Sequence, residues 1–252
     1  MKVMNKPLIK TFAIFKNFPN LVHGFSTRLG GISRPPFDSL NLGLSTADSP
    51  QAVRENRRLF FQALGISQKQ VVFPQQIHSA NIQIVSQAGT VADCDALITD
   101  RPGVYLSIQT ADCFPVFLYA PRHKAVAIIH SGWRGTARNI AGKTVEMLKA
   151  HFGVQPQHLF AAIGPGVQKN CYQVDRSVIS FFSPEFYVPD GSDRFLLDLQ
   201  GAIRRQLQRE GIPDDHIECD TDCTHCRTDL YYSYRRDGQQ SGRMMGIIGL
   251  KP

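Results

Sequence analysis

The stretch Val104 to Gly135, VYLSIQTADCFPVFLYAPRHKAVAIIHSGWRG, indicates the fold. It holds three short apolar runs that are rich in β-branched and aromatic residues and bounded by turn-forming segments, a pattern that predicts buried strands. The runs are Val104 to Ile108, Phe114 to Ala120 and Ala125 to Ile129. Cys113 precedes the second run and His130 follows the third. Consecutive strands with short connections usually lie side by side, so these two residues are expected to meet at one end of a sheet.

The rest of the chain predicts an irregular mixture of strands and helices. Apolar runs and alternation predict strands, and apolar stripes that end at glycine predict helices. Strands are expected at 21–27, 71–73, 81–86, 93–99, 158–163 and 243–250, and helices at 50–64, 136–151, 175–182 and 196–210. No break in composition divides the 252 residues, so one domain over 1–252 is expected, with 1–20 as a lead-in. The order of elements predicts a mixed-sheet α+β or α/β domain.

Composition restricts the partners. Lys and Arg number 28 against 21 for Asp and Glu, which gives a net charge of +7 and favours anionic ligands in general. The basic residues are scattered and not interleaved with aromatic residues, so no nucleic-acid groove is expected. The longest apolar run is far too short to cross a membrane. The charge does not choose among anionic partners, and ordinary solvated surface charge explains most of the excess. The chain is expected to be a monomer or a homodimer.

Six cysteines occur, at positions 94, 113, 171, 219, 223 and 226. A chain with a core of this size does not need disulfides. The apolar run Thr11 to Val22 is interrupted by Lys16 and Pro19 and lacks a small-residue cleavage site, so no secretory signal is expected. We therefore expect a reducing, cytoplasmic environment, in which cysteines more often bind metals or act in catalysis.

Two glycine turns carry an arginine. Arg28 precedes Gly30 and Gly31, and Arg134 lies in the turn Ser131 to Gly135 that follows His130 and opens the predicted helix. Converging backbone N–H groups and a guanidinium can bind a carboxylate or phosphate. From these residues alone, a plain turn with a solvent-facing arginine is the favoured explanation of Arg28. Neither turn has the spacing of a Walker or dinucleotide motif.

Two metal sites are conceivable from the residue types. His78, Cys113 and His130 all lie at strand ends, and three nitrogen and sulfur ligands with an open fourth position are typical of a catalytic zinc. A Cys113 nucleophile with His130 as its base, or simple core packing, fits the same residues. The second candidate is the tail group of Cys219, Cys223 and Cys226 with His225, which lacks the second half of an ordinary zinc knuckle.

Seven ordered segments resemble a known family. They are HGFSTRLGGIS (23–33), PQQIHS (74–79), DALITD (95–100), TADCFPV (110–116), HSGWRGT (130–136), IGPG (163–166) and YSYRRDG with GRM (232–238 and 242–244). In this order they closely resemble the YfiH-like laccase-domain family, which is also described as a purine nucleoside phosphorylase family. The resemblance runs from about residue 20 to the C-terminus. Ser131, in a position where the family more often has alanine, is a small departure.

The resemblance implies a single α/β/β/α domain with two mixed sheets. It also implies a zinc ion bound by His78, Cys113 and His130, with copper as the alternative from older descriptions of the family as polyphenol oxidases. The implied activity is phosphorolysis of adenosine, inosine, guanosine and methylthioadenosine, together with deamination of adenosine. Arg28 would correspond to a phosphate-binding residue.

The expected mechanism places phosphate on Arg28, with Arg134 as a further contact, for attack on the ribose C1′ atom. Asp112, beside the proposed ligand Cys113, is expected to orient a histidine or carry a proton, with a structural hydrogen bond as the alternative. Three other readings stay open: a copper-dependent oxidase, a cysteine hydrolase acting on cell-wall precursors, and a non-enzymatic partner-binding protein.

Overall fold

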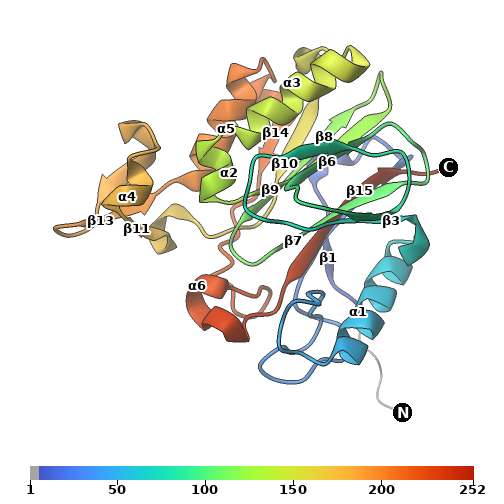
Figure 1. The fold of residues 1–252 in the computed structure, drawn as a ribbon, viewed down its shortest axis with the longest axis horizontal. Helices are drawn as coiled ribbons and strands as arrows, with labels where there is room; N and C mark the ends of the chain where they lie inside the picture. Colours follow the sequence, from blue (N-terminus) through green and yellow to red (C-terminus); the bar gives the residue numbers. More distant parts are fainter. Residues whose placement is uncertain (1–5) are drawn as a thin grey trace.

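Two six-stranded mixed sheets pack face to face with helices on their outer sides, in a computed structural model that describes residues 6–252 (Figure 1). The first sheet has the order β1 (Ile9–Lys10), β2 (Leu21–Ser26), β15 (Met244–Leu250), β7 (Tyr105–Thr110), β3 (Val71–Pro74), β5 (Gly89–Val91). The second has the order β14 (Ile217–Cys219), β10 (Phe160–Ile163), β8 (Phe114–Ala120), β9 (Ala125–Ser131), β6 (Ala96–Thr99), β4 (Ile82–Ile84). The α/β/β/α expectation is confirmed.

The central strands are buried on both faces, which explains their unbroken apolar sequence. Successive side chains of a strand point to opposite faces of its sheet. In β8, Val116 and Leu118 pack toward the helices, whereas Phe117 and Tyr119 pack between the two sheets. β9 alternates in the same way. The strands β8 and β9 therefore contribute to both hydrophobic layers of the second sheet.

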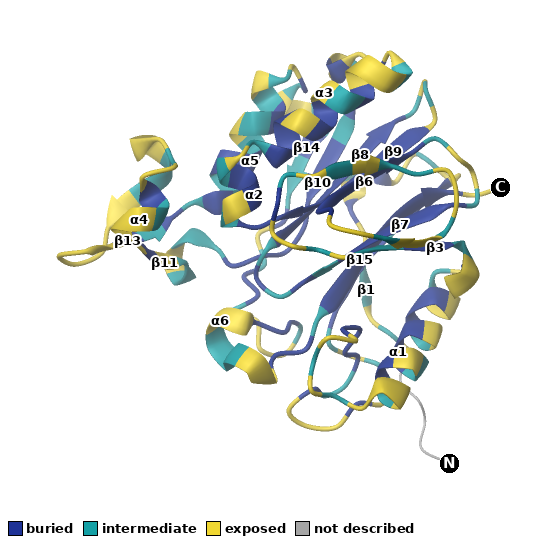
Figure 2. Cartoon of the chain, in the orientation of Figure 1, coloured by how far each residue is buried: buried dark blue, intermediate teal, exposed yellow. Residues whose placement is uncertain are grey.

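Helices cover both outer faces (Figure 1). On the second sheet lie α2 (Trp133–Ala137), α3 (Ile140–Phe152) and α5 (Leu199–Arg209), and on the first lies α1 (Pro50–Ala63). The buried side of each long helix faces its sheet and the exposed side faces outward (Figure 2). In α1, Ser49 caps the first turn and Phe60 and Phe61 enter the core. The short α6 (Tyr234–Asp237) precedes β15.

A small third sheet projects from one side of the molecule (Figure 1). It has the order β11 (Gln173–Asp175), β13 (Arg194–Leu197), β12 (Tyr187–Pro189), and α4 (Arg176–Ile179) packs beside it. The expected helix at 175–182 is therefore mostly wrong, since only one helical turn forms. The helix expected from 196 begins at Leu199, because the residues before it form β13.

Three further expectations need correction. β7 does not neighbour β8 but lies in the other sheet, so the chain crosses between sheets just before Cys113. The single helix expected at 136–151 is two helices, because Asn139 adopts a left-handed conformation (φ 59°) that ends α2 and begins α3. The expected lead-in is part of the fold in its described portion, 6–20, where β1 pairs with β2 and Phe12 and Phe15 enter the core. Its residues 1–5 lie outside the described part. In residues 6–252, no helix has the length and apolar character needed to cross a membrane.

Candidate metal centre

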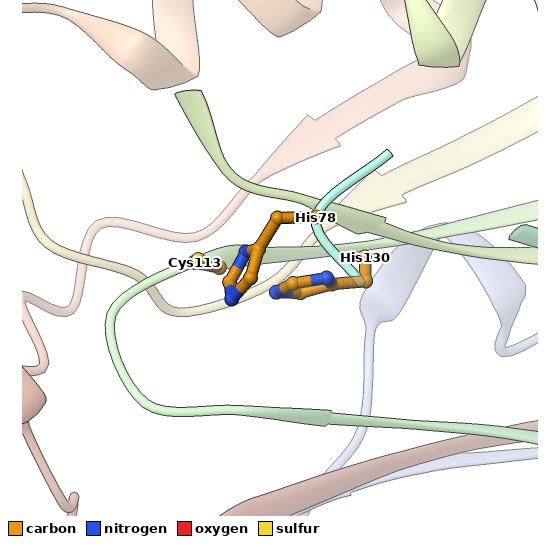
Figure 3. Close-up of side chains that lie close together, drawn as sticks. All are labelled: His78, Cys113 and His130. Carbon is orange, nitrogen blue, oxygen red and sulfur yellow. The ribbon is translucent and has the colours of Figure 1, made fainter. Parts of the chain in front are cut away.

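Three side chains from three separate segments converge at the edge of the sheets. His78 follows β3, Cys113 precedes β8, and His130 lies on β9. One ligand atom from each lies within 4.8 Å of the others. The imidazole centroids of His78 and His130 are 4.8 Å apart, and the three side chains point toward one another (Figure 3). The exposure falls from His78, which is exposed, through Cys113, which is partly exposed, to the buried His130.

Strand register brings Cys113 to His130. β8 and β9 are antiparallel, with Phe114 opposite Ser131 and Pro115 opposite His130. Cys113 is the residue just before Phe114, so its thiol lies at the end of the ladder beside the imidazole. The sequence expectation that these two residues meet at one end of a sheet therefore agrees with the register.

Asp95, at the start of β6, holds the segment that carries His78. Its fully buried carboxylate accepts hydrogen bonds from the backbone N–H groups of Ile77 (3.3 Å), His78 (3.1 Å) and Ser79 (2.6 Å), and from the Ser79 hydroxyl (2.7 Å). His78 has a left-handed backbone (φ 56°), which lets successive N–H groups turn toward one carboxylate.

The same carboxylate orients His130. Nδ1 of His130 donates to Asp95 Oδ1 at 2.8 Å, and the His130 backbone N–H donates to the Asp95 carbonyl at 2.7 Å. A carboxylate on Nδ1 fixes the ring and leaves Nε2 facing the other two side chains. This is the usual arrangement behind a metal-binding histidine. Asp95 thus positions two of the three candidate ligands at once.

Electrostatics in the metal-free site favour a charged pair of Cys113 and His130. Burial opposes a charged thiolate, but the neighbouring imidazoles of His130 and His78 lower the pKa of Cys113 to about 6. Burial likewise opposes a charged His130, but the Cys113 thiolate and Asp95 raise the pKa of His130 to about 9. The thiolate is the form of cysteine that binds metals and acts as a nucleophile. The site is therefore chemically ready for either role.

Metal-free protein should show this ionisation in its thiol reactivity. Because the pKa of Cys113 lies below neutrality, alkylation of Cys113 by iodoacetamide should rise through pH 6 and be near its maximum at pH 7.5. Burial raises the pKa of Cys94 to about 11, so Cys94 serves as the internal control and should stay unmodified. Peptide mass mapping measures both. A Cys113 rate that rises only above pH 8 would contradict the ion pair.

Gly132 leaves room for the three side chains. A Cβ atom added there would lie 2.8 Å from Cys113 Sγ and 3.4 Å from His78 Nδ1, while its φ of −86° suits any residue. The Gly132→Ala substitution should therefore weaken metal binding through crowding that costs about 1–3 kcal/mol, or about 5- to 150-fold in affinity. Ser131→Ala is the matched control: it removes the 2.9 Å contact with the Thr136 hydroxyl and should lower stability by about 1 kcal/mol without changing metal affinity. Competition titration with a chromogenic chelator measures both affinities, and equal values would contradict the crowding.

Asp112 does not contact either histidine. Its carboxylate accepts from the Thr224 hydroxyl at 2.7 Å and from the Arg235 backbone N–H at 2.6 Å. Its backbone is left-handed (φ 88°) immediately before Cys113. Asp112 therefore ties the Cys113 turn to the C-terminal loop. The carboxylate that orients a histidine is Asp95, which sequence reasoning quoted within a motif but gave no role.

Arg28 and Arg134, the two phosphate contacts expected from the sequence, differ in how many of their nitrogens already have protein partners. Arg28 has partners on all three nitrogens: Nε donates to the Asp38 carbonyl (2.9 Å), Nη1 donates to the Thr228 carbonyl (3.0 Å), and Nη2 lies 3.2 Å from Asp38 Oδ1. By contrast, Arg134 is exposed and stacks on Trp133 at 4.4 Å. Within residues 6–252 it forms no ion pair with a carboxylate.

Two further arginines and a tyrosine surround the same region. Burial lowers the pKa of Arg243, and the charges of Asp112 and Cys113 act against that decrease. Burial and the Cys113 charge raise the pKa of Tyr172, on which Arg235 stacks at 5.2 Å. The sequence placed Arg235 and Arg243 within family segments but did not predict that they lie near the candidate site. Their occurrence in those segments was the only feature of the sequence that could have indicated it.

The family follows from comparison with known proteins. A family profile described as multi-copper polyphenol oxidoreductase laccase matches residues 22–251. The chain belongs to this YfiH-like laccase-domain family. Purine nucleoside phosphorylase YlmD of Geobacillus stearothermophilus is 36% identical over 249 residues, which cover 92% of this chain and 91% of the relative. The purine nucleoside phosphorylase of Deinococcus radiodurans is 37% identical over 238 residues, with the same coverage of both chains.

Solved structures of similar proteins share the fold. The crystal structure of YlmD from Geobacillus stearothermophilus matches with a TM-score of 0.93 at 34% identity and covers 100% of this chain and 98% of that one. The YfiH protein of Bacillus licheniformis matches with a TM-score of 0.89 at 36% identity. The family resemblance and the mixed-sheet single domain are thus confirmed. The names of the relatives support an enzyme of the nucleoside phosphorylase kind, and the three-residue cluster supports a bound metal.

Proposed function

We propose that this protein is a zinc-dependent purine nucleoside phosphorylase whose metal ligands are His78, Cys113 and His130. The proposed substrates are adenosine, inosine, guanosine and methylthioadenosine with phosphate, and adenosine deamination is proposed as a second activity. The observation that carries the proposal is the convergence of one thiol and two imidazoles on a space within 4.8 Å, with Asp95 behind His130. The names of the relatives supply the reaction class.

The donor set fits zinc. Two imidazoles and one thiolate with an open fourth position are typical of catalytic zinc, and water bound to such an ion ionises near neutral pH. Oxidases with several copper ions need several histidine-rich sites, whereas residues 6–252 hold only two clusters of three or more candidate ligands, with three histidines between them. Copper binds most such sites more tightly than zinc, so copper found after loading does not identify the native metal.

Arginines beside the site suit a phosphate ion. We propose that Arg134, Arg235 and Arg243 bind phosphate, because they lie around Tyr172 and Cys113 and none is in a carboxylate ion pair within residues 6–252. Phosphorolysis builds positive charge on the sugar and negative charge on the departing base, so an oriented anion beside C1′ lowers the barrier. Arg28, the phosphate contact expected from the sequence, already has partners on all three guanidinium nitrogens, so we propose for it instead a positioning role that ties the Asp38 and Thr228 loops together.

Product analysis tests the function. Purified protein of measured metal content is incubated with adenosine, with and without phosphate, while adenine, hypoxanthine, inosine and ribose 1-phosphate are followed. Phosphorolysis predicts ribose 1-phosphate only with phosphate, in an amount equal to adenine and hypoxanthine together. Deamination predicts inosine without phosphate, and inosine or its product hypoxanthine with phosphate. No change in any nucleoside would contradict the proposal.

The oxidase reading has one observation in its favour, the description of the matching family as laccase. Oxygen uptake with a polyphenol, on the same metal-analysed preparation, distinguishes it. The Cys113–His130 ion pair keeps the cysteine hydrolase reading open. That reading predicts that Cys113 remains open to alkylation after zinc saturation, whereas the metal reading predicts protection.

A further inference from the structure

A second group of metal-binding side chains lies outside the His78–Cys113–His130 site. Cys171 ends the 3₁₀ turn η4 (Lys169–Cys171), and His225 and Cys226 lie in the loop between β14 and α6. One ligand atom from each lies within 4.8 Å of the others, and the Cys171 and Cys226 sulfurs are 3.2 Å apart. Cys223, three residues before Cys226, lies beside this group, and its charge would act on both Cys171 and Cys226.

A backbone amide already faces the Cys223 sulfur. The Gln168 N–H donates to it at 3.4 Å, and His225 and Cys226 follow Cys223 two and three residues further on in the chain. Cys-x2-Cys turns that bind metals have this spacing, and amide donors to the sulfur orient and stabilise the ligand.

The loop is fixed independently of the thiols. Arg236 Nη1 donates to the carbonyls of Thr224 (3.0 Å) and His225 (2.9 Å). A parallel bridge joins Cys223 to Gly166. Backbone contacts therefore hold the segment 166–171 against the loop 223–226, and this brings the cysteine sulfurs of the two segments close together.

We propose that Cys171, Cys223, His225 and Cys226 form a second metal site that binds zinc as a closed tetrahedral centre with three sulfur ligands and one nitrogen ligand. Four protein ligands without an open position are typical of structural zinc. The Cys171 and Cys226 sulfurs are 3.2 Å apart, so as free thiolates they would repel one another, and a divalent cation bound between them would offset that repulsion.

The second site would support the first without taking part in the reaction. Thr224, between the proposed ligands Cys223 and His225, donates to Asp112, which directly precedes Cys113. Tyr172 directly follows Cys171 and lies under Arg235. A metal ion at the second site would cross-link these two segments around the Asp112 turn.

Metal stoichiometry tests the proposal without any activity assay. Protein purified from zinc-supplied cells should hold two zinc ions per chain by plasma mass spectrometry, one for each cluster. The Cys171→Ser/Cys226→Ser double variant should hold one, and so should Cys113→Ser. Cys219→Ser is the matched control, because Cys219 lies at the end of β14 and outside the cluster, and it should still hold two. Equal zinc in the wild type and the double variant would overturn the proposal.

A measurement on the wild-type chain guards against variants that fail to fold. Cobalt added to metal-free protein should produce sulfur-to-cobalt charge-transfer absorption over two equivalents, with the greater share from the site that has three thiolates. A titration that ends at one equivalent, with absorption from one thiolate only, would overturn the second site. A disulfide-linked peptide joining Cys171 to Cys226 in zinc-supplied, freshly purified protein would also overturn it.

Discussion

Replacement of Asp95 by asparagine is expected to weaken metal binding by about 10- to 100-fold, because Asp95 fixes both the ring of His130 and the backbone around His78. The amide cannot accept all of the bonds that the carboxylate accepts, and its NH₂ group must face backbone or ring N–H donors. Loss of a fully buried charge that pairs with His130 should also lower the free energy of unfolding of the metal-free protein by about 3–5 kcal/mol.

Asp93→Asn supplies the matched control for this prediction. It makes the same chemical change two residues away, at an exposed position with a left-handed backbone that asparagine tolerates. Chelator competition gives the metal affinity, and urea unfolding of the metal-free variants gives the stability. If Asp95→Asn behaved like Asp93→Asn in both measurements, Asp95 would not be the residue that organises the site.

Replacement of Cys113 by serine is expected to abolish stoichiometric metal binding at the main site and to lower kcat/KM for phosphorolysis by at least about 10²-fold. A serine hydroxyl stays protonated at neutral pH, whereas Cys113 is largely a thiolate there. The variant keeps only the two imidazoles of His78 and His130, which should bind zinc weakly. Added zinc at high concentration should therefore restore little activity.

Stability separates a specific effect of this change from general damage. The substitution changes one atom but removes the thiolate that faces His130, so the metal-free variant should stay folded and unfold about 1–3 kcal/mol more easily than the metal-free wild type. Cys219→Ser is the control for removal of a thiol as such. A Cys113→Ser enzyme that retained both its full rate and its metal would contradict the assignment of Cys113 as a ligand.

The sequence predicted the sheet cores well and the sheet order poorly. β8 and β9 are apolar on both faces, so their runs were readable without any structure. The short connection between β7 and β8 predicted neighbouring strands, but the chain instead passes from one sheet to the other through the left-handed Asp112. Nothing local distinguishes such a crossing from a hairpin, because the difference lies in which distant strand completes each sheet.

The three candidate ligands were proposed from their residue types and singled out by the family resemblance, and they are brought together by contacts that spacing does not encode. His78 reaches the others because three N–H groups of its turn converge on Asp95. An acidic residue at the start of a buried strand was visible in the sequence, but its partners were not. Asp112, adjacent to Cys113 in sequence, was the more obvious choice and contacts the C-terminal loop instead.

Anomalous diffraction at the zinc edge, from crystals of protein purified without added metal, tests the central claim most directly. The account predicts a zinc peak about 2.3 Å from Cys113 Sγ and about 2.0–2.1 Å from one ring nitrogen each of His78 and His130. An active phosphorylase with no metal at this position, in which Cys113 Sγ contacts only the ring of His130, would contradict the assignment of this site.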